Sequence, residues 1–328
     1  MSRFRNAGFA LAGLLALGAW QPVRAAAVVD DDEEPPAPLG RWSAVIGGIM
    51  DKQNNRGFEA ALDYALTPAT IVKLSGTSVD YTQNNPGGFL SQGLELGVVQ
   101  DFGRFSLSGS LGRWQDTDIL AAQELKLGAS IGHSAWSAGL QGLIRRSKFN
   151  KLTFDQPVTL TGGTVLPAPV DMTCKLNNTG IGAHVRYQGS RFGGYVSAMS
   201  YQYRNAACAF AATGFAQTLH LDQTDFTQLA APLLTRLDMI GPRRIGFENT
   251  LLASQIAAGG SWRHDDLLLS LDLSHQAETF GGPSSNTLAI TAGADLGGGN
   301  GLDMTIGYTR GSTAGSSAFI GFKLRANF

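Results

Sequence analysis

Side chains that could do acid–base chemistry are few and scattered in this sequence. Histidine beside a carboxylate is the usual means of moving a proton near neutral pH. His220, with Asp222 and Asp225 close by in the chain, forms such a local group. The other histidines show neither an HExxH motif nor a paired spacing; they are His133, His184, His264 and His275.

Other chemical motifs are also missing from the sequence. Cys174 and Cys208 are too few for a metal cluster, and neither lies in a CxxC motif. We find no Walker loop, no GxSxG motif and no GxGxxG followed by a helix. The sequence therefore predicts no catalytic site, no cofactor and no metal site.

The composition excludes several classes of protein. Of the 328 residues only 16% are charged, against about 25% in an average domain. This balance argues against a highly charged soluble enzyme, an acidic disordered protein and a nucleic-acid partner. The mature chain has no apolar run of 18 residues, which argues against a helical membrane protein. Low charge and 42 glycines fit a transmembrane β-barrel, whose strands are apolar at every second position.

The first 40 residues predict export followed by a solvated leader. Residues 1–25 have the features of a signal peptide: Arg3 and Arg5 precede about 14 apolar residues, and Val23-Arg24-Ala25 offers a cleavage site. Residues 26–40 carry an acidic run followed by PPAP, which predicts a disordered periplasmic leader that could dock a periplasmic partner. Residues 41–328 are then the barrel.

From residue 41 onward the dominant period of apolar residues is two, as expected for strands with one wet face. In one example Leu267, Leu269, Leu271 and Leu273 alternate with polar residues that include Asp272. We expect fourteen strands, with twelve or sixteen left open as alternatives. The expected ranges are 42–50, 57–66, 69–79, 92–101, 104–114, 119–131, 134–146, 180–190, 192–204, 245–257, 265–277, 286–297, 302–311 and 317–328.

The connections between these strands alternate in length, and this separates a barrel from a soluble sandwich. Every second connection is a tight turn such as Thr67-Pro68 or Phe102-Gly103. The others are longer, above all 147–179 and 205–244. Short periplasmic turns and long external loops are the outer-membrane pattern. The sequence therefore predicts an all-β, antiparallel, up-and-down transmembrane barrel.

The last expected strand, SAFIGFKLRANF, resembles the C-terminal signature of bacterial outer-membrane β-barrel proteins. Its apolar positions include Phe322, Leu324 and the terminal aromatic Phe328. The resemblance implies recognition by the barrel-assembly machinery and a place in the outer membrane of a Gram-negative bacterium, in contact with its lipid and lipopolysaccharide. Aromatic residues near strand ends fit interfacial girdles; they are Trp42, Phe58, Phe105, Trp136, Tyr187, Phe192, Tyr308 and Phe328.

The polar faces of the strands predict a lumen of mixed charge, without the single-sign ring that gives strong ion selectivity. Either these charges line a pore, or they pair across strands and complete the wall. The candidates are Glu59, Asp63, Lys73, Glu95, Glu124, Lys126, Arg145, His184, Arg186, Glu248, Asp272, Asp295, Asp303, Lys323 and Arg325.

The two long loops suggest a restricted mouth. Cys174 lies in the first and Cys208 in the second, and export to an oxidising compartment predicts a disulfide between them. Apolar residues recur at helical spacing from Phe226 to Ile240, with Pro232 inside the run. This segment near 225–240 either folds inward as a constriction or packs on the barrel rim.

We therefore expect a monomeric outer-membrane channel for passive passage of small solutes, with external loops that restrict the mouth. One alternative is a barrel component of a polymer or protein export system. Another is an outer-membrane hydrolase built around His220, and a third is a binding or structural barrel without a pore.

Overall fold

The computed structural model describes residues 42–52, 54–80, 90–116, 120–154, 157–159, 163, 165–166, 170–204, 206–212, 215–221, 226, 252–278, 284–311 and 316–328. The expected signal peptide and acidic leader lie outside these residues. Within the described part of the chain, no helix is long and apolar enough to cross a membrane.

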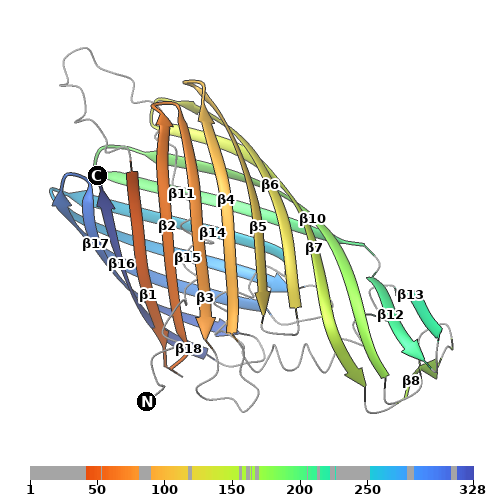
Figure 1. Cartoon of the computed structure of the whole chain (residues 1–328). Helices are drawn as coiled ribbons and strands as arrows, with labels where there is room; N and C mark the ends of the chain where they lie inside the picture. The colour runs from red at the N-terminus through yellow and green to blue at the C-terminus, as the bar shows by residue number, and fades with distance from the viewer. Residues whose placement is uncertain are drawn as a thin grey trace, which may run out of the picture.

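The chain forms a closed antiparallel barrel of 14 strands, in agreement with the prediction (Figure 1). Each strand pairs with its neighbours in sequence, and β1 closes the sheet against β18. The barrel strands are β1 (Trp42–Asp51), β2 (Arg56–Thr67), β3 (Thr70–Asp80), β4 (Leu90–Asp101), β5 (Phe105–Asp116), β6 (Leu120–His133), β7 (Trp136–Phe154), β10 (Val170–Gln188), β11 (Phe192–Tyr203), β14 (Leu252–His264), β15 (Leu267–Glu278), β16 (Ser284–Gly297), β17 (Asn300–Gly311) and β18 (Ser316–Asn327).

Four further strands lie beyond the barrel wall. The short strands β8 (Val158–Thr159) and β9 (Val165–Leu166) pair with each other. β12 (Ala206–Ala212) and β13 (Phe215–Leu221) form a hairpin, and β12 pairs with the first part of β10, at Met172–Lys175. The hairpin lies at the lower right of Figure 1, where β7 and β10 project past the other strands.

The outer surface is apolar at its middle because the two-residue period puts the large hydrophobic side chains outside. On β15, Leu267, Leu269, Leu271 and Leu273 are all exposed, whereas Asp272 faces the interior. Aromatic residues mark the edge of this band at the end with the short connections. The rings of Trp42 and Tyr64 lie 4.3 Å apart, and those of Trp136 and Tyr187 lie 5.0 Å apart.

The two ends of the barrel differ in their connections. At the short-turn end, β6 joins β7 and β14 joins β15 through tight turns, in which Ser134 and Asp265 adopt positive φ angles of 54° and 48°. Asp101 Oδ1 accepts a hydrogen bond from the amide of Gly103 at 2.7 Å, which stabilises the turn after β4. At the long-loop end, β7, β10 and β11 continue into the connections 155–169 and 204–251.

Three expected boundaries differ from the structure. The strand expected at 245–257 is β14, seven residues further on. The strands expected at 134–146 and 180–190 are β7 and β10, and each extends about eight to ten residues into the expected loop 147–179. The expected loop 205–244 contains the β12–β13 hairpin, and Cys174 and Cys208 therefore lie in strands.

A charge introduced on the outer face should lower the free energy of unfolding far more than a charge introduced at the neighbouring inner position. We expect Ile290→Lys, at mid-strand on the outer face of β16, to lower the free energy of unfolding in lipid vesicles by about 2–4 kcal/mol. The adjacent Thr291 faces inward and its hydroxyl bonds that of Thr305 at 2.8 Å. Thr291→Lys should cost about 1 kcal/mol, the loss of that hydrogen bond. Equal losses in urea titrations of the two variants would contradict the assigned faces.

Candidate functional site: the barrel interior and its mouth

The expected lining residues fall almost entirely on inner faces of strands. Asp295 is instead exposed at the short-turn end, where its Oδ1 accepts a hydrogen bond from the Gly297 amide. Glu248 lies outside the described residues. The others point inward, opposite to the exposed apolar residues of the same strands; they are Glu59, Asp63, Lys73, Glu95, Glu124, Lys126, Arg145, His184, Arg186, Asp272, Asp303, Lys323 and Arg325.

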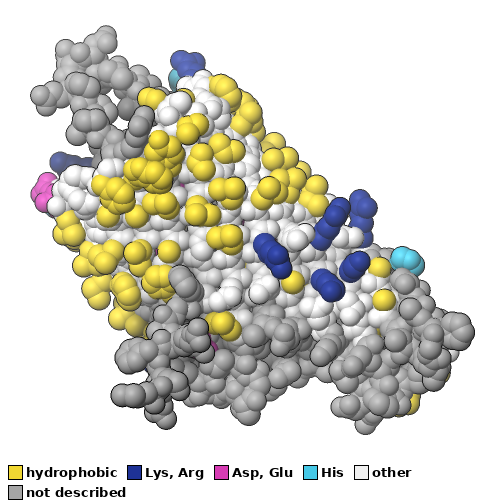
Figure 2. Space-filling model, in the orientation of Figure 1, with side chains coloured by type: hydrophobic (Ala, Val, Ile, Leu, Met, Phe, Trp, Pro, Cys, Tyr) yellow, Lys and Arg dark blue, Asp and Glu magenta, His cyan; other side chains and the backbone are white. Residues whose placement is uncertain are grey.

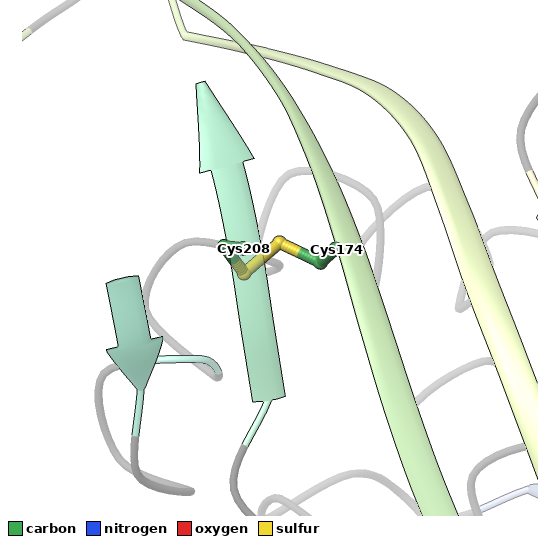
Figure 3. Close-up of a disulfide and its surroundings, with 2 residues drawn as sticks. All are labelled: Cys174 and Cys208. Atoms are coloured by element: carbon green, nitrogen blue, oxygen red, sulfur yellow. A yellow bond between two sulfur atoms is a disulfide. The ribbon is translucent and has the colours of Figure 1, made fainter. Parts of the chain in front are cut away.

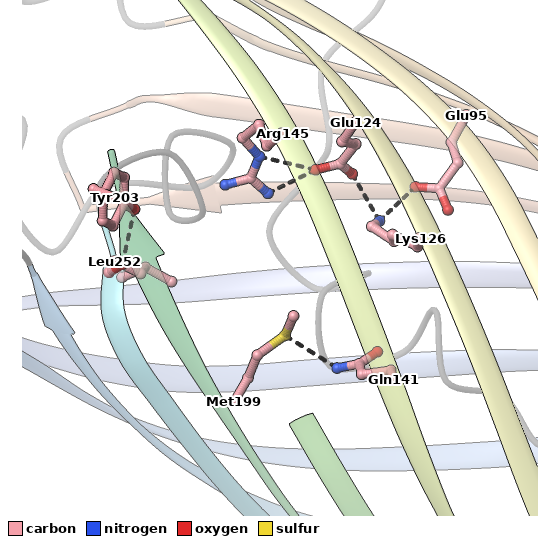
Figure 4. A network of polar contacts seen from close by, with 8 residues as sticks. All are labelled: Glu95, Glu124, Lys126, Gln141, Arg145, Met199, Tyr203 and Leu252. Atoms are coloured by element: carbon pink, nitrogen blue, oxygen red, sulfur yellow. Dashed lines mark hydrogen bonds and ion pairs between the residues drawn. The ribbon is translucent and has the colours of Figure 1, made fainter. Parts of the chain in front are cut away.

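A polar contact network of the interior joins three strands with charges of alternating sign (Figure 4). On β7, Arg145 donates from Nε and Nη2 to Glu124 Oε2 at 3.0 and 2.6 Å. Lys126 Nζ lies 2.8 Å from Glu124 Oε1 and 2.8 Å from Glu95 Oε2. The side chains of Arg145 and Glu124 are only 1% and 9% exposed, so the pair is embedded in the wall.

Several other inward charges are paired in the same manner. Lys73 binds Asp63 at 3.1 Å, Lys323 binds Glu59 at 3.1 Å, and Arg325 binds Asp303 at 3.1 Å. The hydroxyl of Tyr195 donates to Asp272 at 2.9 Å. Each of these pairs thus joins opposite signs, or a hydroxyl to a carboxylate, and leaves no single-sign ring among these described residues.

Glycines opposite the charged residues let these side chains lie flat against the wall. A Cβ at Gly112 would meet Glu124 Cγ at 2.9 Å, and one at Gly47 would meet Glu59 Oε1 at 3.0 Å. Such close approach is open only to a residue without a side chain. The cross-strand pairs are Gly47 with Glu59, Gly97 with Lys73, Gly112 with Glu124, Gly139 with His184, Gly259 with Asp272, Gly293 with Asp303, and Gly301 with Arg325.

Toward the long-loop end the inner wall becomes apolar. Leu143, Tyr201 and Leu252 form a buried cluster, with Met199 and Tyr203 packed against it. The hydroxyl of Tyr203 donates to the carbonyl of Leu252 at 2.8 Å (Figure 4). We did not expect this cluster from the sequence, because Leu143 and Tyr201 lie on strand faces that are polar elsewhere.

One residue of the helically spaced run is described, and it lies inside the wall. Phe226 is fully buried, and its ring packs edge-on against inward-facing Phe149 of β7 at a centroid distance of 5.4 Å. The beginning of this run therefore contacts the inner face of the projecting strands. The remainder of the segment lies outside the described residues.

The predicted disulfide between Cys174 and Cys208 is present (Figure 3). The two cysteines are directly opposite each other in the pairing of β10 with β12. The bond therefore holds the β12–β13 hairpin to the wall, rather than joining two irregular loops as expected.

The acid–base group considered from the sequence is only partly described. His220 is exposed on β13, whereas Asp222 and Asp225 lie outside the described residues. In the described part of the chain no three His, Cys, Asp or Glu side chains are grouped so that they could hold a metal ion.

Comparison with solved structures found proteins that have a similar fold. CymD, a monoaromatic hydrocarbon channel, matches with a TM-score of 0.52 and 10% sequence identity, over 88% of this chain and 89% of that one. The chain has the fold of a bacterial outer-membrane β-barrel.

Two further solved structures match with lower TM-scores. OccAB1 of Acinetobacter baumannii matches at a TM-score of 0.40 and 8% identity, over 88% of this chain and 96% of that one. Omp33 of the same organism matches at 0.44 and 6% identity, over 88% and 99%. No protein-family model and no curated protein matches the sequence. At these identities the similarity establishes the fold alone.

The embedded ion pair should be far more sensitive to substitution than a partly exposed pair. Glu124→Gln leaves the buried Arg145 guanidinium without its carboxylate, and we expect a loss of about 3–5 kcal/mol in the free energy of unfolding. Asp63→Asn breaks the Lys73 pair, whose side chains are 31% and 36% exposed, and should cost less than about 1 kcal/mol. Denaturant titration in vesicles measures both, and similar losses would contradict the burial of Arg145.

Loss of the disulfide should loosen the β12–β13 hairpin and leave the barrel intact. The bond closes a loop of 34 residues, so Cys174→Ser with Cys208→Ser should favour opening of the hairpin by about 3–4 kcal/mol. Limited proteolysis should then cut within residues 204–221 of the variant. Reductant should have this effect on the wild type and none on the variant. Unchanged cleavage after reduction would show that the hairpin is held by other contacts.

Proposed function

We propose that this barrel is an outer-membrane channel for passive passage of small solutes. The long-loop end faces outward, the short turns face the periplasm, and the structure around the projecting strands restricts the mouth. A barrel of 14 strands is intermediate in width between barrels of eight strands, which fill themselves, and porins of 16 to 18, which leave an aqueous channel.

The contrast in exposure along the inner wall supports this proposal most strongly. At the middle and toward the short turns, Asp63, Lys73, Glu95 and Lys126 keep 31–36% of their side-chain surface open to solvent. Toward the long-loop end, Leu143, Arg145 and Phe149 are covered. In this proposal the lumen is wet where these charged side chains are exposed, and the contact of Phe226 with Phe149 restricts it toward the long-loop end.

The paired charges suit a weakly selective passage. Because Lys73 and Lys126 of the inner wall each lie next to a carboxylate, this wall offers a transverse field rather than a ring of one sign. The solute then passes charged groups of both signs before or after the apolar cluster at the mouth. Small polar or amphipathic solutes fit this sequence of surfaces better than a single kind of ion.

The last strand has the features needed for assembly in the outer membrane. Phe322 and Leu324 on the outer face of β18, and Phe328 just after it, form an exposed apolar row at the seam where β18 meets β1. We propose that this row is the part that the barrel-assembly machinery recognises before the seam closes.

Single-channel recording in planar bilayers tests the channel. The purified protein should give steady ohmic steps, because partly exposed charged side chains line its inner wall. Asp63→Asn with Glu95→Gln removes two partly exposed negative charges and should shift the reversal potential in a salt gradient toward anion preference.

A matched control removes two negative charges outside the lumen. Asp265 and Asp266 are exposed at a short turn, and Asp265→Asn with Asp266→Asn should leave the reversal potential unchanged. Silence of the folded wild type, with and without reductant, would contradict a channel. Equal shifts in both double variants would contradict the assigned lining.

A further inference from the structure

A group of basic side chains lies on the outer face of the barrel, just past the apolar band. Figure 2 shows Lys and Arg side chains gathered over the region of β5, β6, β7 and β10, apart from most of the hydrophobic surface. All five are exposed. We call this group the basic patch; it consists of Arg113, Arg146, Lys148, Lys175 and Arg204.

Strand register places the members of the basic patch side by side. Gln123 of β6 is opposite both Arg113 of β5 and Arg146 of β7. Arg146 is in turn opposite Asn177 of β10, whose carbonyl accepts a hydrogen bond from the Arg204 amide at 3.0 Å. The three arginines therefore form one row that crosses β5, β6, β7 and β10 and ends just after β11. Adjacent strands of the row lie about 4.8 Å apart.

A second row lies immediately beyond the first. Lys148 of β7 and Lys175 of β10 are directly opposite each other in the antiparallel pairing. Like charges in that position repel. None of the ion pairs that the described residues form neutralises any member of the patch. A bound anion would remove this repulsion.

The surface next to the basic patch limits the chemical class of an anion that could bind there. Leu111 and Ile144 are exposed on the same faces two residues before Arg113 and Arg146, which is about 7 Å along a strand. A ligand that fits both surfaces has apolar chains against the band and anionic groups at its edge. Arginine pairs with phosphate through two parallel hydrogen bonds, and lysine reaches out to charged head groups while its stem stays on apolar surface.

We propose that the basic patch binds the phosphate groups of lipid A, the acylated anchor of lipopolysaccharide, against the outside of the barrel. The site rests on the proposed orientation, in which the long-loop end lies in the outer leaflet, and it is independent of solute passage. Bound lipid A neutralises the facing lysines and holds the projecting part of β7 and β10 at the membrane surface.

Binding of bisphosphoryl lipid A in detergent micelles to the purified full chain tests the proposal. The patch variant is Arg146→Gln, Lys148→Gln and Lys175→Gln. The matched control changes three exposed basic residues at the short-turn end: Arg104→Gln, Arg191→Gln and Arg263→Gln. We expect the patch variant to bind about tenfold more weakly, as the loss of three partly exposed ion pairs implies, and the control to bind like the wild type.

Further measurements distinguish lipid A from free phosphate as the ligand, and they separate the lipid A site from the proposed channel. Lipid A without phosphates should bind the wild type as weakly as the intact lipid binds the patch variant. Inorganic phosphate at equal concentration should not compete, and the patch variant should keep its heat-modifiable mobility and its conductance. Equal binding by the patch variant, equal weakening in the control or displacement by inorganic phosphate would each overturn the site. A silent wild-type barrel that still binds lipid A through the patch would refute only the channel.

Discussion

Backbone hydrogen bonding is the constraint on which the rest of this structure depends. In hydrocarbon every amide and carbonyl needs a partner within the protein, and a sheet satisfies this only when it has no free edge. Here the closure falls between the first and last barrel strands. At its short-turn end the amides of Trp42 and Phe328 each donate to the other's carbonyl, at 2.9 and 3.0 Å.

Closure gives the two faces of each strand opposite environments, and the residue types on each face match its environment. Outside, leucine, isoleucine and aromatic residues meet an apolar surrounding. Inside, charged residues pair and lie over the glycines of the next strand, as Glu124 does over Gly112. Glycine thus serves the interior by keeping the wall thin, which explains how a barrel of this size carries many charges and still has solvent-exposed lining.

Much of this could be predicted from alternation and turn length, because both reflect the contrast between lipid and water. The strand number, the faces of β15 and β18, the disulfide and the inward position of most charged residues followed from the sequence. Beyond the apolar band the pattern reverses, with charged side chains on the outer face and apolar side chains on the inner face. Alternation there no longer indicates a transmembrane strand. On β7, Arg146 and Lys148 point outward while Phe149 is buried, so this stretch resembled a loop.

The apolar cluster at the mouth could not be predicted for a related reason. Its members come from β7, β11 and the irregular start of β14, where the register shifts between Leu252 and Ser254. A bulge turns a side chain to the other face without leaving a pattern in the sequence.

The central claim is that one face of every barrel strand meets lipid and the other meets an enclosed wet space. Spin labels placed singly at positions 267–274 of β15, in protein inserted into vesicles, test this directly through their accessibility to oxygen, which partitions into lipid. The account predicts maxima at Leu267, Leu269, Leu271 and Leu273 and minima at the positions between them. A flat profile along the strand, or a mature protein that stays dissolved as a compact monomer without detergent, would contradict it.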